Sequence, residues 1–376
     1  MRCATTEPTI IGAGIAGLTL AAALGREGTG CTVYEQADAF TGVGAGVQLT
    51  PNATRLLRRL GLGAWLAGTG VRPTAIELRD WRSGSVLTRV ELGRACEERY
   101  GAPYYTIHRA DLHEGLRALV ADRCGAHTVR VGRRCVAVRE REDDVEVRFA
   151  DGSAVAADLV VGADGVHSVV RAALSPDASR PTGTSVYRAL VPAAIVPRLA
   201  TEPRVLLWPG PGRHVVCYPV RGGAWLNVVA TVPDATRCQP ADAYRGWYED
   251  VLGLLTAGEP TTWAVHDRPA PPLFGAGRIA LTGDAAHPVL PFAAQGANQA
   301  IEDAVVLAGC LRLPERRRAL GEYERLRRPR VARIAAASRA NGERLHRPDA
   351  DRRDLFDSAW IYGHDAELAV PAGGRR

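Results

Sequence analysis

Hydrophobic positions at the start of the chain follow the order of a βαβ unit. A short apolar strand from Pro8 leads through a glycine-rich turn into a helix with Leu18, Ala22 and Leu24 on its apolar side. The segment from Thr32 to Glu35 then has the pattern of a second strand. This order predicts strands joined by a helix that packs on their sheet.

Two further helices have sequence signals at their ends. Thr50, Pro51 and Gly61 bracket the first, with threonine as N-cap, proline at the first helical position and glycine just past the end. The second begins near Arg109. Its core positions recur at helical spacing: Leu112, Leu116, Leu119 and Val120.

In the middle of the chain the spacing of apolar residues changes from a helical period to a period of two. Between Arg134 and Asp158, alternating apolar residues around an Asp-Gly turn predict a small antiparallel meander. From about Pro181 to Asp267 short β-type runs predominate, including Arg213 to Val220 and Ala224 to Thr231, and one helix is predicted near Ala241 to Leu255. We expect this block to form a second domain.

The α/β pattern returns near the end of the chain. A strand from Arg278 to Thr282 is followed by a long helix from about Gly296 and by a helical tail from Pro314 to His346, which we expect to close the first domain. The pattern predicts an α/β fold with a Rossmann-like domain, a sheet-based second domain and C-terminal helices. The first domain is assigned residues 1–72, 101–180 and 268–376, and the second is assigned residues 73–100 and 181–267.

The composition is that of a folded protein and excludes some chemistry. Hydrophobic residues make up 46% of the 376 residues and charged residues 23%, close to the average of globular proteins. All 47 basic residues are arginine, so a Schiff-base lysine and a P-loop lysine are excluded. The arginines concentrate between Arg312 and Arg353, where they predict a solvated helix face, and the stacking aromatics of a nucleic-acid site are missing.

The cysteines stand singly, without a CxxC pair or a histidine cluster at metal spacing, so we expect no metal site. The first residues lack the apolar core of a signal peptide, and no uncharged apolar stretch of about 18 residues occurs. We expect a cytoplasmic protein with reduced thiols, a monomer or homodimer that binds neither nucleic acid nor membrane.

The first turn carries a dinucleotide fingerprint. Gly12, Gly14 and Gly17 form G-x-G-x-x-G between strand and helix, and Glu35 ends the next strand, near the offset of about 20 residues expected for a ribose-binding acid. Glycine lets the backbone approach a pyrophosphate, which then lies at the partly positive N-terminus of the helix. FAD and NAD share this fingerprint, so it does not distinguish them.

Two later strand ends favour FAD. One buried strand ends in the pair Asp164-Gly165, and another ends in Gly283-Asp284. Beyond the second, Gln295-Gly296-Ala297-Asn298 is a glycine-rich entry into an apolar helix. An aspartate at a strand end can hold ribityl hydroxyls, and amides at a helix N-terminus would stabilise negative charge on a reduced flavin ring. The three motifs, in this order, predict a flavoprotein.

These segments resemble the class A FAD-dependent aromatic hydroxylases, and within them the salicylate hydroxylase and 6-hydroxynicotinate 3-monooxygenase branch. The matching stretches span nearly the whole chain and comprise the glycine fingerprint and residues 44–52, 105–113, 164–165, 283–288, 295–303 and 360–364. The resemblance implies a p-hydroxybenzoate hydroxylase-like fold, with noncovalent FAD in the first domain and the substrate in the second. NADH or NADPH would bind transiently as electron donor, since no second G-x-G-x-x-G occurs.

The resemblance also implies cofactor contacts for single residues. Arg109 would reach the phosphate or ribose region of FAD, Asp164 would lie in the groove shared by the pyrophosphate and the nicotinamide cofactor, and Asp284 would hold the ribityl chain. The turn from Gln295 to Asn298 would lie against the flavin ring. An arginine has the wrong sign for the dipole at a helix start, which favours an anionic ligand for Arg109.

Candidate catalytic residues lie on the strand from Arg213 to Val220. Alternation puts His214, Val216 and Tyr218 on one face. Members of the family place a histidine and a tyrosine beside the substrate at the first and last of these positions. In the 6-hydroxynicotinate branch the position of Gln48 is a histidine with an acid-base role, and glutamine cannot exchange a proton at neutral pH. We therefore expect Gln48 to orient the substrate by hydrogen bonding.

The expected reaction is reduction of FAD by NAD(P)H, formation of a flavin C4a-hydroperoxide with O2, and transfer of one oxygen atom to a small electron-rich phenol or aromatic acid. Two alternatives stay open. One is a tailoring monooxygenase that acts on a larger aromatic intermediate by hydroxylation, epoxidation or decarboxylative hydroxylation, and the other is a flavin oxidase or non-catalytic flavoprotein. The arginine excess suits an anionic substrate, but the sequence does not identify the arginine that would bind it.

Overall fold

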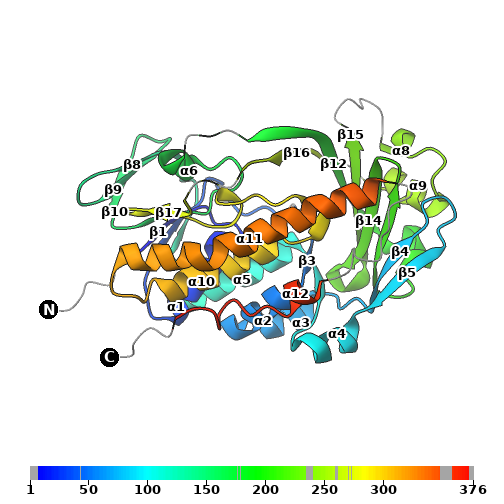
Figure 1. The fold of residues 1–376 in the computed structure, drawn as a ribbon, viewed down its shortest axis with the longest axis horizontal. Helices are drawn as coiled ribbons and strands as arrows, with labels where there is room; N and C mark the ends of the chain where they lie inside the picture. Colours follow the sequence, from blue (N-terminus) through cyan, green and yellow to red (C-terminus); the bar gives the residue numbers. More distant parts are fainter. Residues whose placement is uncertain are drawn as a thin grey trace.

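The structure is a computed structural model. It describes residues 7–42, 44–175, 177, 179–233, 240–258, 261–269, 271, 273–347 and 358–371. A mostly parallel sheet with packed helices occupies one end of the long axis and a larger, mostly antiparallel sheet the other, and the long helix α11 (Arg316–His346) runs beside both (Figure 1). The α/β fold class expected from the sequence is confirmed.

A six-stranded sheet contains the predicted βαβ unit. Its strands stand in the order β17 (Gly275–Ala276), β18 (Ile279–Leu281), β11 (Val160–Gly162), β1 (Thr9–Ile11), β2 (Thr32–Tyr34) and β7 (Val129–Arg130). β1 pairs in parallel with β11 on one side and with β2 on the other. The residues of β1, β11 and β18 are all buried, as expected for parallel strands covered on both faces.

Helices from distant parts of the chain pack together beside this sheet. They are α1 (Ile15–Arg26), α5 (Arg109–Cys124) and α10 (Gly296–Cys310), with α1 in contact with both others. Leu112, Leu116 and Val120 of α5 are fully buried, as predicted, whereas Leu119 is partly exposed. The carboxyl end of β1 leads into the glycine fingerprint, that of β11 into the pair Asp164-Gly165, and that of β18 into the pair Gly283-Asp284.

The helix predicted after Thr50 starts where expected and ends at Gly61, and a second helical segment follows it directly. The segment comprises α2 (Pro51–Leu57), a π-helical turn (Arg58–Leu62) and α3 (Gly63–Thr69). Gly61 has a φ of +88°, the left-handed conformation typical of a glycine just past a helix end, so the predicted end there is confirmed. Thr50 occupies the N-cap position, but its hydroxyl bonds the side chain of Asn52 instead of a backbone amide.

The second sheet has seven strands. Their order is β16 (Thr261–Asp267), β12 (Arg180–Pro192), β15 (Trp225–Pro233), β14 (Arg213–Val220), β13 (Arg204–Gly210), β4 (Ala75–Arg79) and β5 (Val86–Glu91). The predicted strand pair around Gly222 and Gly223 is confirmed as β14 and β15. Apart from Arg180, these strands come from the residues assigned to the second domain, while the division into two domains itself stays a prediction.

One helix prediction in this part is wrong. The segment from Ala241 to Leu255 contains two helices, α8 (Pro240–Ala243) and α9 (Glu249–Thr256). Between them Gly246 has a φ of +80°, a left-handed conformation that interrupts a helix. Tyr244 and Trp247 on this connection are buried against the sheet, so tertiary packing outweighs local helical preference.

Smaller elements complete the fold. The predicted meander is confirmed as a three-stranded antiparallel sheet of β8 (Cys135–Glu140), β9 (Val145–Phe149) and β10 (Ala154–Ala157). The two-stranded sheet of β3 (Gly46–Leu49) and β6 (Tyr105–His108) touches β14, where the first and second sheets approach each other. The other helices are α4 (Gly93–Tyr100), α6 (Val169–Leu174), α7 (Pro197–Ala200) and α12 (Ala359–Tyr362).

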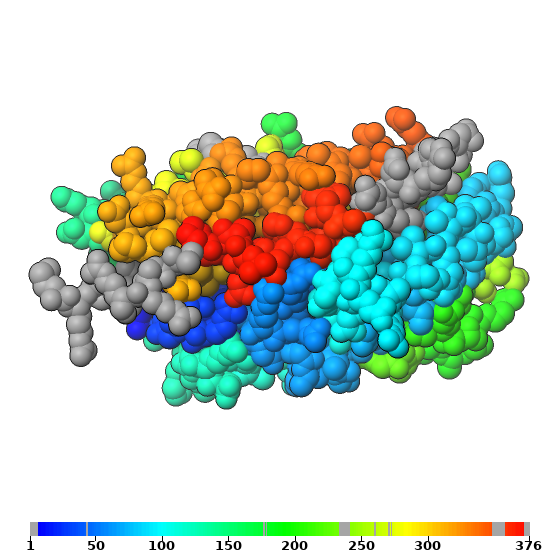
Figure 2. All heavy atoms as spheres, turned by 60° about the horizontal axis from the view of Figure 1, so that its bottom comes forward, coloured from blue at the N-terminus to red at the C-terminus, as the bar shows by residue number. Residues whose placement is uncertain are grey.

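The burial and the extent of α11 differ from what the sequence predicted. Arg327 on this helix is buried, so the arginine-rich segment is not only a solvated face. The helix also extends beyond the first sheet, because the carbonyl of its last residue, His346, accepts a hydrogen bond from the amide of Gly212 beside β14. Figure 2 shows the C-terminal residues 358–371, in red, lying between α11 and α2. Among the described helices, none is long and apolar enough to span a membrane.

Candidate active site

The first strand-helix turn has the shape of a pyrophosphate cradle. A Cβ on Gly12 would lie 2.4 Å from the carbonyl oxygen of Ala163, and one on Gly17 would lie 2.0 Å from that of Gly12, so both positions require glycine. A Cβ on Gly14 would meet nothing within 4 Å. The open side at Gly14 lies at the N-terminus of α1, where free amides attract an anion. The residues present therefore fit the pyrophosphate of FAD.

Glu35 and Arg109 flank this cradle. The carboxylate of Glu35 accepts hydrogen bonds from the amides of Ala13 at 2.8 Å and Ala37 at 3.0 Å, which hold it beside the turn with further acceptor capacity for ribose hydroxyls. Arg109 is exposed at the first turn of α5, and no carboxylate of the described residues pairs with it. Both arrangements suit FAD. The contacts of Glu35 with the ribose and of Arg109 with the phosphate or ribose region stay predictions.

The sequence motifs meet around one cavity of about 350 Å³. Its cofactor side is lined by Gly14, Arg109, Gly165, Asp284, Gln295, Gly296 and Ala297. Its other side is the face of the seven-stranded sheet, with Arg188, His214, Val216 and Tyr218. Residues separated by nearly three hundred positions in the chain thus enclose a single space between the two sheets.

The two aspartates predicted at strand ends differ. Asp284 faces the cavity, and the protein that encloses it raises the pKa of its carboxyl group. Asp164 instead accepts hydrogen bonds from the Ser168 hydroxyl and from the amides of Val169 and Val170 at the start of α6. Burial raises its pKa despite these bonds. Asp164 therefore shapes the wall, and its neighbour Gly165 lines the cavity.

The turn before α10 presents its backbone to the cavity. The side chain of Gln295 donates to the Thr50 hydroxyl at 3.0 Å, and that of Asn298 donates to the carbonyl of Gln48 and accepts from the amide of Thr50. Both side chains are fully buried in this network. Gly296 and Ala297 line the cavity, whereas Asn298 does not. The expected flavin contact, which stays a prediction, would use the amides at the N-terminus of α10.

A buried ionic network lies behind this turn. Arg327 pairs with Glu302 at 2.5 Å and with Asp303 at 2.6 Å. Asp303 also binds Nε2 of His287 at 2.5 Å and the amide of Gly283 at 2.9 Å. Burial alone would raise the pKa of Asp303, but His287 and Arg327 outweigh it and lower the value to about 2. The network fixes the Gly-Asp strand end and the start of α10 relative to each other.

The predicted alternation on β14 is confirmed. His214, Val216 and Tyr218 line the cavity, while Val215 and Cys217 are buried in the core on the opposite face of the sheet. Burial raises the pKa of Tyr218, so the phenol stays protonated and can donate a hydrogen bond.

His214 has a partner that the sequence did not indicate. Its Nδ1 lies 3.0 Å from Nε2 of His346, the last residue of α11, and both rings pack against Phe292. Burial, followed by the charge of His346, lowers the pKa of His214 to about 3. The imidazole of His214 is therefore neutral at neutral pH.

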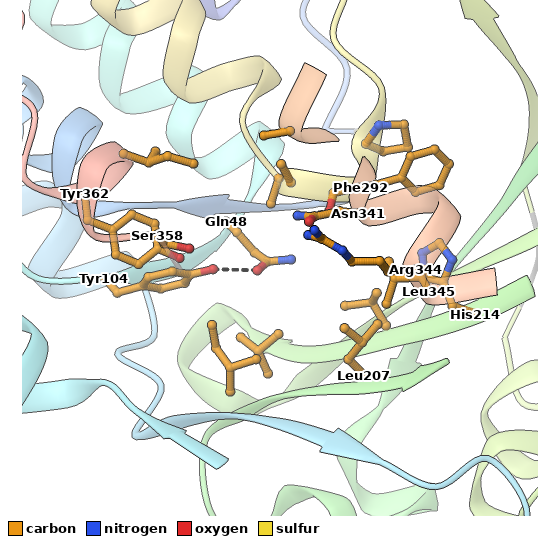
Figure 3. Close-up of a pocket in the computed structure, with 18 of the residues that line it drawn as sticks. Gln48, Tyr104, Leu207, His214, Phe292, Asn341, Arg344, Leu345, Ser358 and Tyr362 are labelled. Atoms are coloured by element: carbon orange, nitrogen blue, oxygen red, sulfur yellow. Dashed lines mark hydrogen bonds between the residues drawn. The ribbon is translucent and has the colours of Figure 1, made fainter. Parts of the chain in front are cut away.

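A second cavity of about 450 Å³ adjoins the first and shares Gln48, His214 and Val216 with it. The amide oxygen of Gln48 accepts a hydrogen bond of 2.5 Å from the Tyr104 hydroxyl, and Figure 3 shows this pair beside Tyr362. Arg344 of α11 extends into the same space. Tyr104 directly precedes the matching stretch of residues 105–113 and was not predicted as a site residue, because an isolated tyrosine carries no motif.

Comparisons with known proteins agree with this geometry. The family described as FAD binding domain matches residues 5–338. The chain is 46% identical to 3-amino-4-hydroxybenzoate 2-monooxygenase of Streptomyces cremeus over 96% of this chain and 95% of that protein. The chain belongs to the FAD-binding aromatic monooxygenase family.

Solved structures extend the comparison to the fold. HpxO of Klebsiella pneumoniae, solved with FAD and uric acid, superposes with a TM-score of 0.83 at 28% identity over 97% of both chains. A salicylate hydroxylase substrate complex superposes with a TM-score of 0.78 at 29% identity over 98% of both. The p-hydroxybenzoate hydroxylase-like fold, the resemblance to salicylate hydroxylase and the requirement for FAD are thereby confirmed. The protein is an FAD-dependent aromatic monooxygenase.

Proposed function

We propose that the monooxygenase hydroxylates a single-ring aromatic acid that carries a hydroxyl or amino group, of the 3-amino-4-hydroxybenzoate type. The observation that carries the proposal is the cavity between the cofactor motifs and the face of β14, with His214 and Tyr218 on one wall and Gln48 beside them. The 46% identity to an enzyme named for this substrate, along almost the whole of both chains, supports the same class.

The side chains on the sheet face would orient the ring. Neutral His214 can accept a hydrogen bond from a substrate hydroxyl or amino group, and protonated Tyr218 can donate one. Gln48 would add a third polar contact from β3, held by Tyr104. Val216 and Val229 supply apolar wall between these groups and help to exclude water.

Bound FAD, reduced by NADH or NADPH, would supply the reaction with dioxygen that delivers one oxygen atom to the ring. The residues that would hold it are the glycine cradle, Glu35, Arg109 and Asp284, with the first amides of α10 at the flavin end. His214, with His346 as its hydrogen-bond partner, would orient the substrate hydroxyl or amino group by accepting a hydrogen bond, because its lowered pKa makes it a weak proton acceptor.

The test is turnover of a substrate panel by the purified holoenzyme. Hydroxylated benzoates, aminohydroxybenzoates, their decarboxylated phenols and bulkier phenols are each supplied with NADH or NADPH, and products are identified by mass. We expect single-ring acids to stimulate NAD(P)H oxidation and to gain one oxygen atom. Preference for bulky phenols would instead identify a tailoring enzyme, and peroxide without product for every compound would identify an oxidase.

The cellular location and the assembly of the protein also stay proposals. We infer a cytoplasmic location from the single, unpaired cysteines, of which six lie in the described residues and are free thiols. A monomer or homodimer is the expected assembly. Light scattering coupled to size-exclusion chromatography separates these assemblies from larger ones.

A further inference from the structure

Arg188 is a partly buried cation for which the described part of the protein supplies no anion. Its Nε atom is inaccessible to solvent and has no hydrogen-bond partner, and no described carboxylate lies within ion-pair distance. Other deeply placed arginines are paired. Examples are Arg171 with Asp177, Arg204 with Glu77, Arg268 with Asp177, and Arg327 with Glu302 and Asp303.

The sheet register places Arg188 on the same face as the candidate catalytic residues. Arg188 on β12 is opposite Val229 on β15, which is opposite Val216 on β14. Two strand spacings separate Arg188 from Val216, about 10 Å between the backbones. All three residues line the cavity that the cofactor motifs enclose. An aromatic ring lying on this face would therefore reach from His214 and Tyr218 toward the guanidinium.

The surroundings of Arg188 make an external anion favourable. Burial lowers its pKa, and Arg109, which lines the same cavity, adds charge of the same sign. Its guanidinium carbon lies 5.6 Å from the centre of the Trp263 ring on the edge strand, a weak contact that leaves the N–H groups unpaired. Removing one partner from a buried ion pair is costly because the remaining charge is uncompensated. An arriving carboxylate would relieve that cost at Arg188.

We propose that Arg188 binds the carboxylate of the aromatic acid substrate. The proposal rests on the proposed function, since it assigns the ionic subsite of the same cavity. Arginine presents parallel N–H donors that match the two oxygens of a carboxylate, which fixes the direction of the ring as well as its position. The acid is then held between Arg188 at one end and His214 with Tyr218 at the other, and neutral analogues are discriminated against.

Arg344 is the matched control. It lines the adjoining cavity, and no hydrogen bond or ion pair joins it to another described residue. Its side chain is partly exposed near the end of α11, so water can solvate the charge without a ligand. The two arginines therefore share charge and proximity to the site, but only Arg188 lines the cavity of the cofactor motifs and has an inaccessible Nε atom without a hydrogen-bond partner.

The experiment compares holoenzymes of the wild type, Arg188→Gln, Arg188→Lys and Arg344→Gln. Each is titrated with 3-amino-4-hydroxybenzoate, 3-hydroxybenzoate and the corresponding carboxamides, and binding is followed by the flavin absorbance without turnover. We expect Arg188→Gln to weaken binding of the acids about 10- to 100-fold and to leave carboxamide binding unchanged. Arg188→Lys should be intermediate, and Arg344→Gln should match the wild type.

Further readouts separate the outcomes. FAD affinity and the thermal stability of ligand-free Arg188→Gln should not fall, because an unpaired buried charge is removed. Unchanged preference for acids over carboxamides in Arg188→Gln overturns the proposal, as does transfer of the effect to Arg344→Gln or a loss of FAD affinity as large as the loss of acid affinity. Failure of the wild type to bind any acid overturns the proposed function together with the subsite. Acid affinity and turnover equal to those of the wild type in all variants overturn the subsite alone.

Discussion

Arginines in two regions of the molecule differ in whether a carboxylate lies beside them. Behind the turn that precedes α10, Arg327 contacts both Glu302 and Asp303. On the face of the seven-stranded sheet, Arg188 has no such neighbour among the described residues. A buried charge that is paired inside the protein stabilises one arrangement of the chain, whereas an unpaired charge at a cavity is available to a ligand.

Two acids, Glu302 in the core and Asp284 at the cavity, also differ in whether the protein supplies an opposite charge. Burial would raise the pKa of Glu302, but Arg327 and Arg330 outweigh burial and lower it to about 2. Asp284 lacks an ion pair to a described cation, and its pKa is raised by burial. Glu302 is thus ionised for structural reasons, while Asp284 gains most when a ligand donates hydrogen bonds to its carboxylate.

The largest expected effect comes from breaking the paired region. Glu302→Gln removes the carboxylate that pairs with Arg330 and one of the two that pair with Arg327, and we expect the free energy of unfolding to fall by about 3–5 kcal/mol. Urea denaturation of the holoenzyme measures this change. Arg188→Gln, assayed alongside, should show no comparable loss. A similar loss in both variants would remove the distinction between the two regions.

Local signals in the sequence predicted the parts of the site that depend on the backbone. Gly12, Gly14 and Gly17 indicated the cradle because a glycine-rich turn has a fixed spacing, and alternation placed His214 and Tyr218 on one face. Arg188, Tyr104 and His346 were missed. The roles of these three residues depend on the side chains that face them across strands or helices. The spacing of residues along the sequence does not indicate such contacts.

The errors in the fold have the same origin. The connection between α8 and α9 was predicted as helix because its residues favour one locally, but Tyr244 and Trp247 are buried in the core and Gly246 adopts a left-handed conformation. Likewise, arginines in a helix usually face water, and only the acidic pair on α10 explains why Arg327 is buried.

The second-largest expected effect is on FAD affinity and comes from Asp284, the acid without an ion pair to a described cation. Asp284→Ala should weaken FAD binding about 100-fold, because hydrogen bonds between charged groups and their partners are among the stronger polar contacts. Reconstitution of the apoprotein, followed by flavin fluorescence, gives the affinity. Asp164→Asn is the control, since that carboxylate is already bonded to Ser168 and to backbone amides. Equal FAD affinity in Asp284→Ala and wild type would contradict the assigned contact.

The third effect is a pH dependence that comes from His214. Its pKa is about 3 in the folded protein and near 6.5 when unfolded, so the unfolded chain binds more protons between these values. Stability should therefore fall by about 1 kcal/mol per pH unit as pH decreases through this window. Denaturation at several pH values should give a shallower slope for His214→Asn. Identical slopes would mean that His214 is protonated in the folded state.

The smallest effect concerns orientation at Gln48. Tyr104→Phe removes the hydrogen bond to the Gln48 amide, and we expect the Michaelis constant for the aromatic acid to rise about 3- to 10-fold, as for the loss of one neutral hydrogen bond. Steady-state kinetics with constant NAD(P)H measures it. The rate of flavin reduction should not change, and a loss of FAD in this variant would show that the pair supports the cofactor instead.

The central claim is that this cavity joins a flavin to an aromatic acid and inserts one oxygen atom. The most direct measurement is turnover of 3-amino-4-hydroxybenzoate by the yellow holoenzyme under isotopically labelled dioxygen, with mass analysis of the product and parallel counting of NAD(P)H consumed. The account predicts one labelled oxygen atom in each product molecule and one NAD(P)H oxidised for it. Unlabelled acid recovered intact, with peroxide accounting for all the NAD(P)H, would contradict it.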